Sequence, residues 1–272
     1  MVFIICLTIG ILTAFIGSIA GLGGGIILVP SLFLMYSISD DFSWATPQVI
    51  VGVSLVTMIF TGLSSAIAYL KAKRVDIRTA VYFLAGSIPG GMIGAWFIQF
   101  VNADQFTLYF GFVMILISLL LFIKRDRIKP KAIIEGKRVR TFHLHGVEYK
   151  YQVSPTLAFF LALGVGILSG LFGIGGGSIM VPLMILLFGI PAHIATATSM
   201  FMIFFVSISG SITHIALGHI AWEYVWLFIP GAWIGGKLGA KVNQLITGKA
   251  LAWILRILLI IVGIRMIIQG LS

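Results

Sequence analysis

The sequence predicts an all-α membrane protein that crosses the bilayer several times and consists of two inverted repeats. Three observations lead to this prediction: a composition that is 60% hydrophobic and 10% charged, ten apolar runs, and a glycine-rich motif that occurs twice. Soluble domains carry about 25% charged residues, and a membrane β-barrel would alternate apolar and polar residues over ~10-residue segments. Both classes are therefore excluded. So little water-facing surface also argues against nucleic-acid binding, despite a net charge of +10.

Eight of the apolar runs have the length of a helix that spans the ~30 Å hydrocarbon core of a bilayer. They lie at roughly 3–20, 47–70, 79–100, 105–123, 155–172, 192–217, 221–242 and 250–269. Two shorter runs, 26–38 and 178–190, follow glycine clusters, and at ~1.5 Å per residue each extends only ~20 Å. We therefore expect about eight full spans and two short or broken helices.

The glycine clusters reveal an internal repeat. GLGGGIILVP at 21–30 and GIGGGSIMVP at 173–182 are identical at seven of ten positions, and the segment from Ser54 aligns with the segment from Ser199. A third match pairs Pro89-Gly90 and Ile93-Gly94 with Pro230-Gly231 and Ile234-Gly235. The expected organisation is a first transmembrane repeat at 1–123, a basic linker at 124–153, and a second transmembrane repeat at 154–272.

Loop charges predict how the repeats are oriented. The linker and the loop 71–78 are rich in Lys and Arg, which places them in the cytoplasm, whereas the acidic loops with Asp40, Asp41 and Asp104 fall outside. Counting crossings from these loops puts both termini outside the cell membrane and gives the two halves opposite directions, as in inverted-topology repeats.

Part of the linker is expected to fold. Apolar and polar residues alternate along 142–144 and 147–151, around His145-Gly146, which indicates a short β-hairpin. An alternative is a regulatory or metal site that uses His143 and His145.

The glycine clusters are the expected substrate site. Each precedes a short helix whose first N–H groups lack intrahelical partners, and the positive end of a helix dipole favours anions. Inverted halves can bring two such ends together near the middle of the membrane. We expect the backbone N–H groups of Gly24, Gly25, Gly176 and Gly177 to hold a small anion. The alternative is that these glycines only allow close helix packing.

Polar residues within the spans supply further candidates. Ser54, Thr198 and Ser199 follow the short helices and can donate hydroxyls to the anion, although hydroxyls also bond between helices. The charges deep within spans are cations, and Arg256 is the deepest, so it is the expected cationic partner of the substrate. Lys237 and His214 are candidate anion or proton helpers. Snorkelling of Lys237 and Arg256 to the headgroups and a purely structural His214 are the alternatives.

No catalytic motif occurs in the sequence: it has no Gly-x-Ser-x-Gly, no His-Glu-x-x-His, no cysteine pair and no phosphate-binding loop. We therefore expect a transporter rather than an enzyme, with no cofactor and no metal. The expected partners are a small anionic substrate and the lipid bilayer, and the sequence leaves a homo-oligomer open.

The two glycine motifs, the Ala197-Thr198-Ser199 step and the two Pro-Gly-x-x-Ile-Gly motifs resemble the TauE/SafE family of sulfite exporter-like permeases. The first half departs from the pattern, with Gly52-Val53-Ser54 in place of Ala-Thr-Ser. The resemblance implies a secondary transporter that exports sulfur-containing anions such as sulfite or organosulfonates by alternating access. The residues themselves indicate an anion site but not sulfur. A carrier for carboxylates or other metabolite anions, and a non-transporting membrane scaffold or assembly factor, remain alternatives.

Overall fold

The computed structural model describes residues 2–122, 139–144, 147–245 and 248–271. Its ten α-helices coincide with the ten predicted runs, with ends within about three residues. The first half contains α1 (Val2–Ala20), α2 (Gly25–Ile38), α3 (Pro47–Lys71), α4 (Ile77–Phe97) and α5 (Ala103–Phe122), with 3₁₀ turns at Asp40–Phe42 and Ile98–Phe100. The second half contains α6 (Pro155–Phe172), α7 (Gly177–Leu187), α8 (Ala192–Ala216), α9 (Trp222–Asn243) and α10 (Gly248–Leu271).

Six helices in the described ranges are long and apolar enough to cross a membrane: α1, α3, α4 with its 3₁₀ extension, α5, α6 and α8. The apolar helices α2 and α7, and residues 259–271 of α10, are shorter. The helix α9, which carries Lys237 and Lys241, does not meet the criterion. The sequence predicts α9 as a full span, but α9 is not among these six helices. Only residues 259–271 of α10 enter this comparison, so a full span at α10 stays a prediction. Helix α9 packs along α1, and α10 packs along α5.

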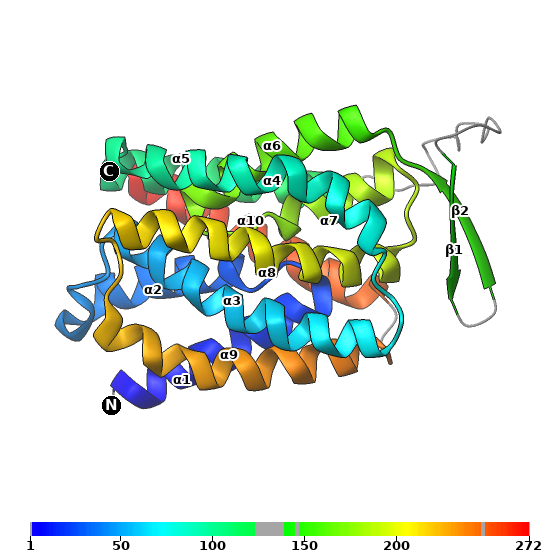
Figure 1. The fold of residues 1–272 in the computed structure, drawn as a ribbon. Coiled ribbons are helices and arrows are strands. Elements are labelled where there is room, and N and C mark those ends of the chain that lie inside the picture. The colour runs from blue at the N-terminus through cyan, green and yellow to red at the C-terminus, as the bar shows by residue number, and fades with distance from the viewer. Residues whose placement is uncertain (1, 123–138, 145–146, 246–247, 272) are drawn as a thin grey trace.

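The two halves run in opposite directions through the bundle. The N- and C-termini lie at one end, which we call the termini end, and the strands lie at the other, the hairpin end (Figure 1). Helix α1 starts at the termini end, whereas α6 starts next to the strands. The halves also exchange partners: α1 packs against α9 and α6 against α4, while α3 pairs with α8 and α5 with α10. The fold is thus an interleaved inverted repeat.

Glycine ladders bring the exchanged helices into backbone contact. We call the glycines at every fourth position of α4 and α9 the glycine ladders. The ladder of α4 faces α6 and that of α9 faces α1, and a side chain at any of these glycines would collide with a carbonyl oxygen of the partner helix. The contacts are Gly86 with Phe159, Gly90 with Leu163 and Gly94 with Ile167 in one pair, and Gly231 with Leu7, Gly235 with Ile11 and Gly239 with Phe15 in the other. Small residues allow this close approach in membrane helices.

These contacts correct the third sequence match. Leu163 and Ile11 occupy the same place in the two repeats, so the structural equivalent of Gly90 is Gly235 rather than Gly231. The predicted pairing was displaced by one helical turn. Glycines at every fourth position make the register ambiguous, and aligning the two prolines selected the wrong turn.

The predicted hairpin in the linker is confirmed. Strands β1 (Val139–Leu144) and β2 (Val147–Gln152) pair antiparallel, while His145, Gly146 and the basic segment 123–138 lie outside the described residues. Burial and the adjacent carboxylate raise the pKa of Tyr151, so its hydroxyl stays protonated and donates to Oδ2 of Asp76 at 2.6 Å. This bond fixes the hairpin to the α3–α4 loop. Among the described residues, His143 included, no three His, Cys, Asp or Glu side chains gather as a metal site.

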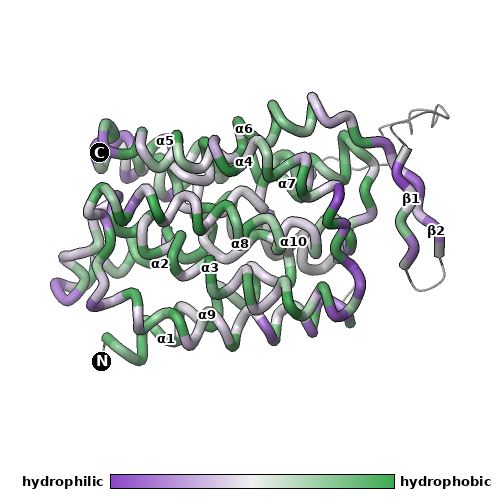
Figure 2. The backbone as a smooth tube through the Cα atoms, viewed as in Figure 1, coloured by the Kyte–Doolittle hydropathy of each residue, from purple (hydrophilic) through white to green (hydrophobic). Residues whose placement is uncertain are grey.

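The hydropathy of the chain matches a protein embedded in lipid. Hydrophilic segments gather at the two ends of the bundle, and mostly hydrophobic helices lie between them (Figure 2). Large apolar side chains are exposed along the helices, among them Phe112, Phe160 and Trp226. An exposed apolar surface of this extent suits the hydrocarbon core.

Candidate functional site

The two glycine segments meet in the middle of the bundle. We call residues 21–25 and 173–177 together the glycine crossing. Gly25 packs against the carbonyl of Gly173, and in the other half Gly177 packs against the carbonyl of Gly21. Helices α2 and α7 both begin here, so two helix N-termini from opposite directions converge at one point, as the sequence predicted.

Backbone geometry explains why glycine recurs at the crossing. Gly21, Gly23 and Gly24 have φ angles of 75°, 84° and 94°, and their equivalents Gly173, Gly175 and Gly176 have 66°, 69° and 70°. Other residues rarely adopt this left-handed region. The same chain path is therefore built twice, once in each direction.

Two serines join the halves at the crossing. The hydroxyl of Ser54 donates to the carbonyl of Gly173 at 2.7 Å, and the hydroxyl of Ser199 donates to the carbonyl of Gly21 at 2.8 Å. Both side chains are buried. Each bond runs from one half to the other, so separating the two halves at the crossing would break both.

The helix starts leave backbone donors at the crossing. Among the hydrogen bonds of the described residues, none is donated by the amides at 24–26 or at 176–178. Gly24 and Gly176 accept bonds through their carbonyls from the first turns of α2 and α7. Six N–H groups therefore remain at the convergence of two helix dipoles, an arrangement that suits an anion.

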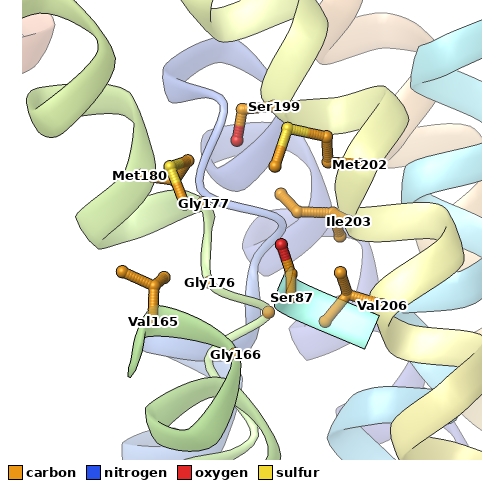
Figure 3. A pocket seen from close by; sticks show the side chains of 11 residues that line it. Ser87, Val165, Gly166, Gly176, Gly177, Met180, Ser199, Met202, Ile203 and Val206 are labelled. Carbon is orange, nitrogen blue, oxygen red and sulfur yellow. The ribbon is translucent and has the colours of Figure 1, made fainter. Parts of the chain in front are cut away.

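The space beside these donors is small. A cavity of about 10 Å³ adjoins Gly175, Gly176 and Gly177. Figure 3 shows it enclosed by apolar side chains of α6, α7 and α8, with the hydroxyls of Ser87 and Ser199 nearby. A volume of this size accommodates about one water molecule, so the crossing is closed to an oxyanion in this conformation.

Three predicted site residues lie away from the crossing. The hydroxyl of Thr198 accepts a bond from the backbone N–H of Asp76 at 3.1 Å, on the side of the α3–α4 loop. Lys237 lines a surface cavity between α3 and α9. Arg256 belongs to the α5–α10 pair, where its carbonyl accepts a bond from Ser118. The structure thus brings together the four predicted glycines with Ser54 and Ser199.

Comparison with known proteins identifies the family. The family model described as "Sulfite exporter TauE/SafE" matches residues 6–266, nearly the whole chain. The chain belongs to the TauE/SafE family.

Relatives of this TauE/SafE protein are named as transporters. It is 45% identical over 273 residues to the "Probable membrane transporter protein YunE" of Bacillus subtilis, covering 99% of each chain. It is 26% identical over 275 residues to the "Probable membrane transporter protein MJ0441" of Methanocaldococcus jannaschii, covering 96% of this chain and 93% of the other. No solved structure matches it significantly. This TauE/SafE protein is thus a multi-pass membrane transporter.

His214 occupies a position that the repeat uses twice. Its Nε2 lies 3.5 Å from the carbonyl of Gly170, while its equivalent Tyr69 donates to the carbonyl of Ser18 at 2.9 Å. The rings of His214 and His219 are 5.4 Å apart. His214 therefore has a packing role that Tyr69 shares in the first half, and its role as an anion or proton helper stays a prediction.

Sequence reasoning missed part of a row of buried hydroxyls in this TauE/SafE protein. We call Ser169 of α6, Ser178 of α7, and Ser207 and Ser211 of α8 the serine row. Each is at most 2% exposed, and within the described part of the chain none of their hydroxyls, nor Nδ1 of His214, has a hydrogen-bond partner. On α8 the sequence signal was the spacing of Ser199, Ser207 and Ser211, which are eight and four residues apart and therefore lie near one face of a helix. Nothing in the sequence pointed to Ser169 and Ser178.

The serine row has a direction. On α8, Ser207, Ser211 and His214 follow Ser199 along one face, from the crossing toward the termini end. A buried polar group without a partner costs about 1–3 kcal/mol, and most such groups are satisfied in native proteins. The hydroxyls of the serine row on α6, α7 and α8 are therefore polar groups of the second half that the fold itself leaves without a partner among the described residues.

Proposed function

We propose that this TauE/SafE transporter exports small sulfur-containing anions, such as sulfite or organosulfonates, by alternating access at the glycine crossing. The observation that carries the proposal is the convergence of two helix N-termini with six unused N–H donors. Paired short helices of this kind mark the substrate site in inverted-repeat transporters. The choice of sulfur anions rests on the family description.

The amides of Gly24, Gly25, Gly176 and Gly177 would hold the anion, and Ser54 and Ser199 would turn their hydroxyls toward it. A hydrogen bond to a charged group contributes roughly 1.5–3 kcal/mol. Several such donors can hold an anion without a fixed counter-charge, which keeps release fast. Thr198, Lys237 and Arg256 are not required as ligands in this arrangement.

Opening and closing would follow from the serine bonds between the halves. With the substrate absent, Ser54 and Ser199 hold the crossing closed through the carbonyls of Gly173 and Gly21. An anion that recruits both hydroxyls would release those carbonyls and loosen the contact between the halves. Substrate binding would thereby favour the switch between the two open states.

Export would proceed from the hairpin end to the termini end. The basic loop 71–78 supports a cytoplasmic location of the hairpin end. From the crossing, the serine row leads outward and ends beside His214. A negative-inside potential drives each unit of negative charge outward by ~2.3 kcal/mol per 100 mV, so export of a monoanion needs no coupling ion.

The test is a flux screen with the full-length protein in proteoliposomes. Sulfite, sulfate, an organosulfonate and a carboxylate are each loaded, and a membrane potential of either sign is imposed. We expect sulfite or the organosulfonate to move at least tenfold faster than the others, in the direction set by the potential. Faster carboxylate flux would make the protein a carrier of metabolite anions. Flux no faster than in empty liposomes would favour a scaffold organised around the hairpin.

A further inference from the structure

A basic cavity opens on the outer surface of the bundle, between α3 and α9 at the hairpin end. It measures about 690 Å³ and is lined by three lysines, Lys71, Lys237 and Lys241, together with Ser64, Trp233 and Gln244. None of its lining residues, all of them in the described ranges, is acidic. The cavity therefore concentrates positive charge at the level of the predicted cytoplasmic headgroups.

An apolar groove continues from this cavity toward the middle of the helices. It measures about 450 Å³ and is lined by Phe60, Ile229, Pro230, Trp233 and Ile234. Trp233 lines both spaces, so they adjoin at its ring. A cationic head region followed by an apolar groove has the polarity of a phospholipid.

We propose that this surface binds a phospholipid with an anionic headgroup, with the headgroup at Lys71, Lys237 and Lys241 and one acyl chain along the groove. Charge complementarity decides the headgroup, because three cations meet no lining carboxylate. Basic pockets between helices on the cytoplasmic side bind anionic headgroups. Tryptophan at the junction suits the boundary between headgroups and acyl chains.

The repeat-related surface between α4 and α8 has no counterpart to this site. There the repeat places Met92, Trp96 and Ala216 at the positions equivalent to Lys237, Lys241 and Lys71. The chain therefore keeps the three cations at one end only. A lipid bound there would lie in the leaflet at the hairpin end, and the equivalent surface in the other leaflet would bind no such lipid.

The experiment measures lipid binding to the detergent-purified full-length protein by native mass spectrometry. The probes are phosphatidylglycerol, phosphatidylcholine of the same chain length, and soluble glycerol phosphate. We expect phosphatidylglycerol to bind at least tenfold more tightly than either other probe. Equal binding of glycerol phosphate would assign the lysines to a soluble anion instead, and equal binding of phosphatidylcholine would remove the role of charge.

Variants separate the groove from general surface charge. The triple change Lys71→Gln, Lys237→Gln and Lys241→Gln should lower the affinity for phosphatidylglycerol at least tenfold, since each lysine contributes about fivefold. The matched control, Lys73→Gln, Arg78→Gln and Lys150→Gln, removes three cations from the same end outside the groove and should change the affinity less than twofold. An equal loss in the control would overturn the proposal.

Two single changes guard against a folding defect in the triple variant. Lys237→Gln alters one exposed side chain and should lower the affinity for phosphatidylglycerol about fivefold. Ile229→Trp narrows the apolar groove without touching a charge and should weaken phosphatidylglycerol but not glycerol phosphate. Unchanged lipid binding in both variants would contradict the proposed site.

Discussion

The helices beside the glycine crossing differ between the two halves, whereas the crossing itself is symmetric. The second half places the serine row along α6, α7 and α8, whereas the equivalent first-half positions are Gly17, Ile26, Gly62 and Ala66. At the crossing, by contrast, Gly25 and Gly177 make matching contacts, and Ser54 and Ser199 make matching bonds. A symmetric crossing suits alternate opening toward the two sides of the membrane. The helices beside it carry unpartnered hydroxyls in the second half and none at the equivalent positions of the first half.

The surface of the bundle also combines symmetric backbone packing with side chains that differ between the two repeats. The lysines between α3 and α9 have Met92, Trp96 and Ala216 as their counterparts between α4 and α8. The backbone contacts beneath them remain paired, as the glycine ladders of α4 and α9 show. The two halves therefore share the packing of the bundle, while side chains that face solvent or lipid differ between them.

The largest effect should come from filling the symmetric centre. Gly25→Val and Gly177→Val should each abolish anion flux in proteoliposomes, because a side chain there meets the carbonyl of the opposite segment. The control is Gly164→Val, since nothing lies within 4 Å of that position. If both crossing variants insert and fold but transport at the wild-type rate, the glycines serve packing alone.

A second prediction concerns the asymmetric flank. Changing Ser169, Ser207 and Ser211 together to Ala should lower flux about 100-fold, as expected if at least two donors to an anion are lost. The unfolding temperature should stay the same or rise, because the hydroxyls removed have no partner. A merely structural role would instead lower it.

The matched control for that triple removes hydroxyls that bond within their own helices. Ser31, Ser37 and Thr107 each donate to a carbonyl four residues earlier. Changing all three to Ala should leave flux within about twofold of wild type, since exposed or partly buried local bonds contribute little. A comparable loss of flux in this control would show that the assay reports general damage.

The smallest of the three effects should expose the symmetry directly. Ser54→Ala and Ser199→Ala should weaken anion binding by about tenfold each, one donor's contribution, and cost about 1–3 kcal/mol of stability by orphaning a buried carbonyl. The measurements are the half-saturation of flux and the unfolding free energy. Clearly unequal effects of the two changes would show that the crossing is not functionally symmetric.

Much of the fold followed from the apolar runs and the repeat. Runs of apolar residues located every helix, and the doubled glycine motif located the centre, because few other sequences can form that backbone. The alignment of α4 with its repeat equivalent α9 could not be fixed in the same way. Glycines at every fourth position of both helices can be aligned equally well one helical turn away. Only the contacts of α4 with α6 and of α9 with α1 show which alignment is correct.

The candidate site was predictable only where backbone geometry determines it. The four glycines, Ser54 and Ser199 came together as expected. Thr198 adjoins Ser199 in sequence, but a helix turns about 100° per residue, so its hydroxyl faces Asp76 instead. Ser169 and Ser178 lack hydrogen-bond partners because of how side chains of several helices pack around them. The sequence alone does not show which side chains of different helices become neighbours.

Thiol labelling tests the central claim most directly. In a Cys6→Ala background, Ser54→Cys and Ser199→Cys are exposed to a membrane-impermeant maleimide from either side, with Arg74→Cys and His219→Cys as markers of the two faces. If the crossing opens alternately, both central cysteines should label from both sides, while each marker labels from one side, opposite to the other. Labelling of the central cysteines from neither side or from only one side would contradict alternating access at the crossing.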